Sequence, residues 1–212
     1  MTFNIGLIIN PLAGLGGSVA LKGSDDVASE ALALGAIPKA NARCLQALAE
    51  VATLDVCVYA FGGDMGADCA LSAGLKTEVV GKAKTQPSSA ADTISAAQML
   101  LTQGVDLLVF VGGDGTARDL LSAIGDQVPV VGIPAGVKIH SGVYGITPLA
   151  AGQVIAQLIR GELVSLRSQE VRDIDEQEFR AGRVKARYYG ELQVPESHQY
   201  MQATKDSTKP GS

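Results

Sequence analysis

The chain has 212 residues, and its 17 basic and 22 acidic side chains give a formal net charge of −5. It contains no run of basic residues, so the charge pattern argues against nucleic acid as a partner. No stretch reaches the roughly 18 uninterrupted apolar residues of a membrane span, and no charged-then-apolar leader follows Met1. We therefore expect a cytoplasmic protein without membrane contact.

Hydrophobic residues make up 47% of the chain, but aromatic residues only 4%, and tryptophan is absent. The core must therefore consist mainly of Ala, Val, Leu and Ile, which suits a parallel sheet covered by helices. Cys44, Cys57 and Cys69 show neither CxxC spacing nor a nearby histidine. We expect them to be buried apolar side chains rather than disulfide partners or zinc ligands.

Short apolar runs alternate with longer helix-like segments in the first part of the chain. Near-continuous apolarity is typical of strands that are buried on both faces. The predicted strands are 3–9, 55–61, 77–81, 106–111 and 128–133, and the predicted helices between them are 41–53, 64–74, 88–104 and 116–125. This alternation predicts an α/β fold with a doubly wound, mostly parallel sheet.

Two helix starts carry capping signals. Ser89 and Asp92 have the spacing of a capping box. Thr147 as N-cap and Pro148 as first helical residue predict a further helix that ends at Gly161.

After Gly161 the sequence becomes charged and alternates apolar with polar residues as far as Pro195. A turn signal at Arg180-Ala181-Gly182 predicts an antiparallel hairpin in this stretch.

The segment GGDGT directly follows a predicted strand. In an open parallel sheet, ligands bind beyond the carboxyl ends of the strands. Gly112, Gly113 and Gly115 can bring bare backbone amides against a phosphate. Thr116 adds a hydroxyl and an expected N-cap, and the following helix offers its positive end to an anion.

Asp114 is an unusual residue for a loop that only holds phosphate, because a carboxylate repels an anion. It could bind a Mg²⁺ ion that bridges phosphates, or accept the proton of a hydroxyl that attacks phosphorus. A tight turn in which Asp114 caps the helix is the structural alternative.

Polar side chains also follow two other predicted strands. Lys138, His140 and Ser141 lie in a glycine-bounded loop that chain order places at the same sheet edge as Asp114. Lys138 could contact a phosphate or ribose, while His140 is either functional or a hydrogen-bonded structural histidine. Asp64, with Asp68, could bind metal or ribose, and capping of the 64–74 helix is the alternative for Asp64.

The segment VFVGGDGT resembles the nucleotide-binding motif shared by NAD kinases, diacylglycerol kinases and sphingosine kinases. LIINPLAGLGG at 7–17 is similar to the first strand and Asn-Pro turn of those kinases. VVGIPAGVKIHSGVYGITP at 130–148 occupies the place of their next glycine-bearing segment.

Further segments are most similar to the ATP-NAD kinase-like branch, which includes proteins found with acetoin catabolism. They are LKGSDD at 21–26, FGGDMGAD at 61–68 and TQPSSAADT at 85–93. The resemblance covers about residues 1–160, and ELQVPESHQYMQATK at 191–205 resembles the start of the family's β-rich second domain. The expected organisation is a Rossmann-like nucleotide-binding domain at 1–161, followed at 162–212 by an incomplete β-rich second domain with a polar tail.

The resemblance implies that Asp114 is the base for the acceptor hydroxyl. It also implies that the nucleoside triphosphate is held by Gly112, Gly113, Gly115 and Thr116. Asn10 would lie beside the phosphates, with capping of the following turn as the alternative. Lys138, His140 and Ser141 are added as nucleotide contacts from their place in the chain, and no residue is assigned as a metal ligand.

The sequence departs from the lipid kinases at two places. Arg118 and Asp119 stand where those kinases continue with an Asn-Glu pair, and PAGV at 134–137 replaces their Pro-x-Gly-Thr. The Gly-Phe-Leu segment of the NAD kinases is not visible after this region either.

The resemblance implies a NAD kinase-like enzyme that uses ATP and Mg²⁺ to phosphorylate the 2′-hydroxyl of the adenosine ribose of NAD, which gives NADP. Its expected partners are small nucleotides, and the family implies a homodimer. Two alternatives stay open: a nucleotide-binding sensor without catalysis, and a kinase for a lipid or another small hydroxylated acceptor. The phosphoryl donor, ATP or polyphosphate, also stays open.

Overall fold

The computed structural model describes residues 1–10 and 39–203. Five strands form the main sheet in the order β3-β2-β1-β4-β5, and every neighbouring pair is parallel. The strands are β1 (Phe3–Ile9), β2 (Val56–Phe61), β3 (Lys76–Gly81), β4 (Leu107–Gly112) and β5 (Val130–Pro134). All five predicted strands are confirmed, with small differences at their ends.

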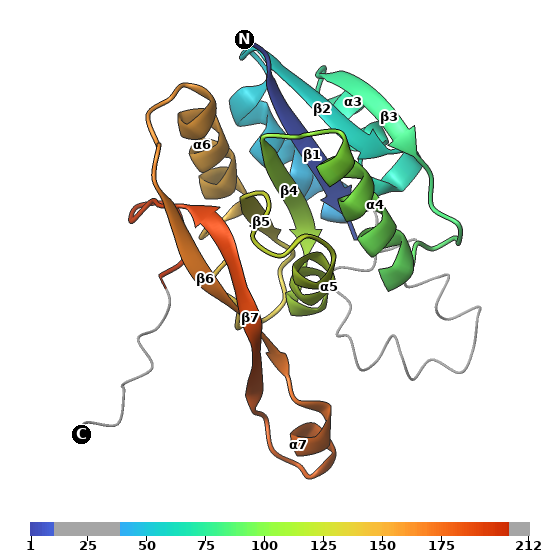
Figure 1. Cartoon of the computed structure of the whole chain (residues 1–212), viewed down its shortest axis with the longest axis vertical. Coiled ribbons are helices and arrows are strands. Elements are labelled where there is room, and N and C mark those ends of the chain that lie inside the picture. The colour runs from blue at the N-terminus through green and yellow to red at the C-terminus, as the bar shows by residue number, and fades with distance from the viewer. Residues whose placement is uncertain (11–38, 204–212) are drawn as a thin grey trace.

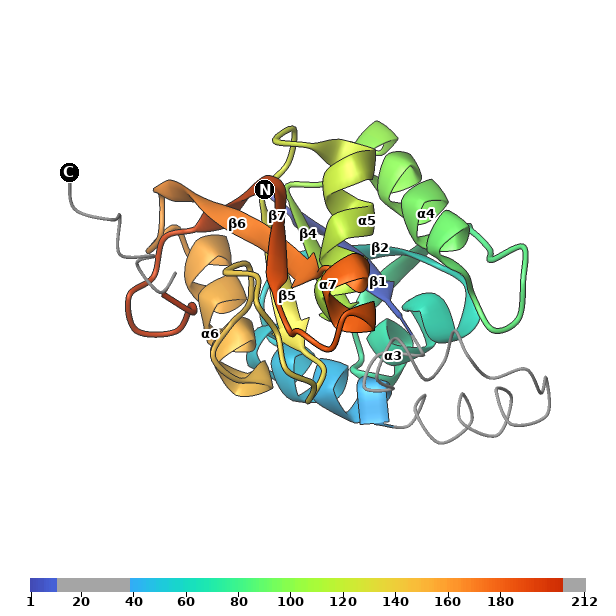
Figure 2. The same cartoon turned by 90° about the horizontal axis from the view of Figure 1, so that it is seen from below.

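Helices cover both faces of this sheet (Figures 1 and 2). One face carries α4 (Ala90–Thr102) and α5 (Asp114–Ile124). The other carries α3 (Ala67–Ser72), α6 (Pro148–Ile159) and a helix over 39–48 that continues into η1 (Ala49–Val51). The expected doubly wound α/β fold is therefore confirmed.

Aliphatic side chains fill the space between the sheet and its helices. The strand β4, which lies between β1 and β5, is buried from end to end, because helices cover it on both sides. A Cβ on Gly6 would lie 2.9 Å from Cδ1 of Leu100, so this glycine allows α4 to pack closely on β1. Cys44, Cys57 and Cys69 are buried free thiols, as expected from their spacing.

The helix starts at Ser89 and Thr147 are confirmed. Ser89 Oγ accepts a hydrogen bond from Asp92 N (3.3 Å), and Asp92 Oδ2 accepts one from Ser89 N (2.9 Å), which completes the capping box. Thr147 Oγ1 accepts from Ala150 N (3.0 Å), with Pro148 at the first helical position.

The expected N-cap at Thr116 is wrong. The helix α5 begins at Asp114, and its N-cap is Gly113, whose backbone is extended. The chain therefore turns from strand to helix within the glycine pair, and Thr116 lies in the first turn with its hydroxyl facing β1.

The stretch after α6 forms the predicted antiparallel hairpin, from β6 (Leu166–Ile174) and β7 (Ala186–Pro195). Its connection holds the short helix α7 (Glu176–Arg180), and this end of the hairpin projects away from the sheet (Figure 1). The middle of β6 contacts the loop after β5, where Gly142 N donates to Glu170 O (3.0 Å). Among the residues described, no helix has the length and apolar character needed to cross a membrane.

Candidate functional site

The carboxyl ends of β1, β4 and β5 bring three polar segments together. These are Asn10, the GGDGT turn and the loop 135–143, and Figure 2 views the molecule from this side. Asn10 N donates to Val111 O (2.9 Å), so β1 and β4 are still paired where the glycine turn begins. The structure thus confirms that the segments after these strands share one edge of the sheet.

Thr116 connects the glycine turn to Asn10, the residue that follows β1. Its hydroxyl accepts a hydrogen bond from Asn10 Nδ2 (3.0 Å), and its side chain is buried. A Cβ on Gly112 would lie only 2.6 Å from Cβ of Thr116, so only glycine allows this approach. Gly112, Thr116 and Asn10 therefore shape the turn through contacts with one another.

Asp114 binds the loop after β5. Its Oδ2 accepts from the backbone N of His140 (2.8 Å), and its Oδ1 accepts from the backbone N of Ser141 (3.0 Å). Nδ1 of the His140 ring lies 3.1 Å from the same Oδ2. An ionised carboxylate only accepts hydrogen bonds, so the ring proton belongs on Nδ1, and Nε2 of a neutral ring carries the lone pair.

His140 is the more accessible member of this pair. The side chain of His140 is 19% exposed, whereas that of Asp114 is 5% exposed. A ligand bound at this edge of the sheet can therefore reach the imidazole of His140 more readily than the carboxylate of Asp114.

Ser141 and Lys138 lie on the same loop but in different environments. The Ser141 hydroxyl donates to Arg172 O and accepts from Arg172 N, both at 2.9 Å, and this ties the loop to β6. Lys138 is exposed and takes part in no ion pair within the described residues. The structure thus places Lys138 toward solvent and the hydroxyl of Ser141 inside the protein.

Asp64 and Asp68 lie after β2, in and just beyond η2 (Gly63–Met65). The N-cap of α3 is Gly66 and no side chain caps it, so the capping alternative for Asp64 is wrong. Burial, followed by the charge of Asp68, raises the pKa of Asp64 above its ordinary value. Within the described ranges, no group of three or more His, Cys, Asp or Glu side chains could hold a metal ion.

The sequence pattern does not single out Arg43, which the fold brings to the loop after β5. A Cβ on Gly136 would lie 2.8 Å from Cζ of Arg43, so the guanidinium rests directly on the glycine. Arg43 lies in a helical segment that is far from Gly136 in the sequence, and no local motif predicts the contact between the two residues.

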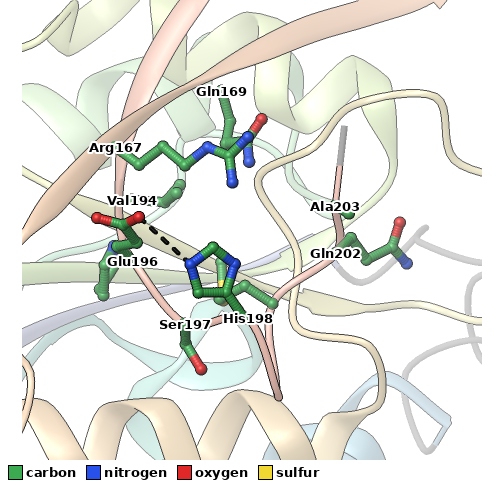
Figure 3. A pocket seen from close by; sticks show the side chains of 10 residues that line it. Arg167, Gln169, Val194, Glu196, Ser197, His198, Gln202 and Ala203 are labelled. Carbon is green, nitrogen blue, oxygen red and sulfur yellow. Dashed lines mark ion pairs between the residues drawn. The ribbon is translucent and has the colours of Figure 1, made fainter. Parts of the chain in front are cut away.

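A small cavity of about 40 Å³ lies elsewhere, between the hairpin and the segment 195–203 (Figure 3). Glu196 and His198 both line it, and Nε2 of His198 lies 3.5 Å from Oε1 of Glu196. None of the predicted site residues lines it. Ligand pockets usually measure roughly 300–1,000 Å³, so this cavity is too small for a nucleotide.

The fold and the glycine turn define a doubly wound α/β protein with a candidate ligand site at the carboxyl edge of its sheet. The family model of the ATP-NAD kinase N-terminal domain matches residues 5–163. The chain therefore belongs to the ATP-NAD kinase family, which confirms the resemblance read from its motifs and implies a kinase-like enzyme. Comparison with curated proteins and with solved structures found no match.

Proposed function

We propose that the protein is an ATP-dependent phosphotransferase of the NAD kinase type. It transfers the γ-phosphoryl group of ATP to the 2′-hydroxyl of the adenosine ribose of NAD, and the products are ADP and NADP. Membership in the family supports this class of reaction. The observation that carries the proposal is the buried Asp114 carboxylate, which holds the ring of His140 at the carboxyl edge of the sheet.

The glycine turn suits a nucleoside triphosphate. Gly115 is exposed, and the atom nearest to an added Cβ is Asp173 Oδ2 at 4.0 Å, so a phosphate can approach this backbone. The N-terminus of α5 favours an anion at the same place. Lys138, exposed on the neighbouring loop, adds a positive charge.

The described residues do not fit a protein-held Mg²⁺ ion at this edge. Both oxygens of Asp114 already accept hydrogen bonds from the loop after β5. Mg²⁺ commonly keeps several waters and binds mainly through substrate phosphates, so the ion would arrive with ATP. Residues of the chain then carry the proton transfer.

In the proposed reaction the acceptor oxygen attacks the γ-phosphorus, and the bond from that phosphorus to the oxygen of ADP breaks. The proton of the acceptor hydroxyl passes to Nε2 of His140, the ring nitrogen with the lone pair. Asp114 Oδ2 holds Nδ1–H and stabilises the positive charge that the ring gains. Asp114 is thus required for proton removal, and His140 takes up the proton.

The test compares NADP formation by the wild-type protein, Asp114→Asn and His140→Ala. His140→Ala removes the ring but keeps both backbone bonds to Asp114, so it isolates the proton transfer from the shape of the loop. Both variants should lose about 10²–10⁴-fold in kcat. Stabilisation by ATP, read as a rise in Tm, should persist in both.

Full turnover by folded Asp114→Asn would contradict the role of the carboxylate. ATP binding by the wild type without turnover on any acceptor would instead favour the sensor alternative. Turnover on a sphingoid base or diacylglycerol, but not on NAD, would favour the lipid-kinase alternative.

A further inference from the structure

Arg43 carries a guanidinium nitrogen that is buried without a hydrogen-bond partner. Among the described residues, its Nη1 has no acceptor and Arg43 takes part in no ion pair. A charged donor that is removed from water and left unpaired costs free energy. This arrangement indicates that an anion normally completes the site.

The loop around Gly136 is built to accept the guanidinium. Gly136 has φ of +78°, and an added Cβ would overlap Nη2 of Arg43. Any other residue would be strained there and would push the guanidinium away. The glycine therefore allows the guanidinium of Arg43 to lie directly against the loop.

This loop also lies beside the glycine turn. A Cβ on Gly113 would be 3.5 Å from Cγ2 of Val137, in ordinary van der Waals contact. Lys138 follows directly and is exposed. The nearest acid of the turn, Asp114, directs its oxygens to His140 and Ser141 instead of Arg43. Arg43 and Lys138 therefore bring two positive charges to this loop, and neither forms an ion pair within the part of the chain that the structure describes.

We propose that Arg43 forms a phosphate subsite together with the backbone of Gly136 and the ammonium of Lys138. The planar guanidinium suits the oxygens of a phosphate, which it can bind with two parallel hydrogen bonds. The assignment of this phosphate to the polyphosphate chain of the nucleotide rests on the proposed function. The presence of an anion subsite rests only on the geometry of Arg43.

The experiment compares Arg43→Met with Arg183→Met by isothermal titration. Methionine keeps the length and apolar contacts of the side chain but removes its charge. Arg183 is a matched control, because its side chain is 69% exposed on the hairpin and pairs with Glu178. The probes are ATP, adenosine and inorganic triphosphate, which separate the phosphate chain from the nucleoside.

Arg43→Met should weaken the binding of ATP and of triphosphate by about tenfold or more, which corresponds to the loss of a charge-assisted hydrogen bond. Adenosine binding should not change, and Arg183→Met should bind all three probes as the wild type does. Arg43→Lys, which keeps a charge but loses the fork, should lie between the wild type and Arg43→Met.

The Tm without ligand separates this role from a purely structural one. Arg43 is partly exposed, but its Nη1 is buried without a partner among the described residues, so removal of the guanidinium should leave the Tm of Arg43→Met unchanged or raise it. A large fall in Tm for both Arg43→Met and Arg43→Lys, or wild-type affinity of either folded variant for ATP and triphosphate, would overturn the subsite. A wild type that binds triphosphate through Arg43 but forms no NADP would refute the proposed function and leave the subsite in place.

Discussion

Asp119 lies half-buried on α5, one helical turn after the exposed glycine of the turn. Burial raises its pKa to about 6; Arg118 opposes this shift and Asp173 adds to it. A carboxyl whose pKa is raised on folding keeps its proton more tightly in the folded state. The protonated Asp119 carboxyl therefore contributes fully to the free energy of unfolding below about pH 4, the ordinary pKa of Asp. This contribution is lost as the pH rises through about 6.

We expect Asp119→Asn to remove this decline, because the amide does not ionise. The variant should match the wild type near pH 4 and exceed its free energy of unfolding above pH 6 by on the order of 1 kcal/mol, since the site is partly solvated. Urea unfolding at several pH values measures this. Asp126→Asn is the control, because Asp126 is exposed just beyond the same helix, and parallel pH profiles for wild type and Asp119→Asn would contradict the prediction.

At the scale of elements, the hairpin docks on α5 through charges and a close glycine contact. Arg118 pairs with Asp173 at 3.2 Å, and its guanidinium lies 3.9 Å above the ring of Tyr189. Gly190 has φ of +146°, and an added Cβ would lie 2.8 Å from Cδ2 of Leu121 on α5. This glycine allows β7 and α5 to approach each other.

Gly190→Ala should destabilise the protein more than Gly182→Ala does. Both positions have positive φ, so each substitution costs about 1–3 kcal/mol of backbone strain. Only the Gly190 variant also pushes against α5, because nothing lies within 4 Å of an added Cβ on Gly182. Chemical denaturation of both variants measures the difference. Equal decreases in the free energy of unfolding would show that the contact with Leu121 adds no measurable cost.

At the scale of the whole molecule, the part of the chain that matches the family model contacts the segments that follow it. Residues 5–163 match the family model, yet the Ser141 hydroxyl pairs with Arg172 on β6, and Gly145 bridges to Met201. Val171, Leu192 and Val194 of the hairpin are also buried. The loop that holds Asp114 is therefore supported from both sides of the predicted domain boundary, which itself stays a prediction.

A chain shortened to residues 1–163 should be less stable by several kcal/mol, because each buried Val or Leu contributes about 1.5–3 kcal/mol. It should also lose stabilisation by ATP, since the loop after β5 would lose its bonds to β6. A chain that ends at residue 203 keeps these contacts and is the control. Thermal unfolding with and without ATP tests both points, and an unchanged Tm for 1–163 would contradict the prediction.

Much of the fold could be predicted from the sequence, because its causes are local. Near-continuous apolar runs mark strands buried on both faces, and β1 to β5 appear where these runs occur. The capping box at Ser89 and the Thr147-Pro148 start depend on neighbouring residues alone. The position of GGDGT after a buried strand predicted that these residues lie at the carboxyl edge of the sheet, where the structure has them.

The details of the candidate site depend on residues that are distant in the chain. Asp114 accepts hydrogen bonds from His140 and Ser141, which belong to the loop after another strand. Arg43 lies on a helix that precedes the glycine turn in the sequence, and it contacts Gly136, which follows that turn. No local pattern encodes these contacts.

The sequence by itself determined the strands, the capped helix starts, the hairpin and the family, because each depends on short-range periodicity or a contiguous motif. Only the tertiary structure decided that α5 starts at Asp114, that this carboxylate holds His140, and that Nη1 of Arg43 has no acceptor among the described residues. The physical reason is that hydrogen bonds and buried charges are satisfied by whichever groups the packed sheet brings together, whatever their separation in the chain.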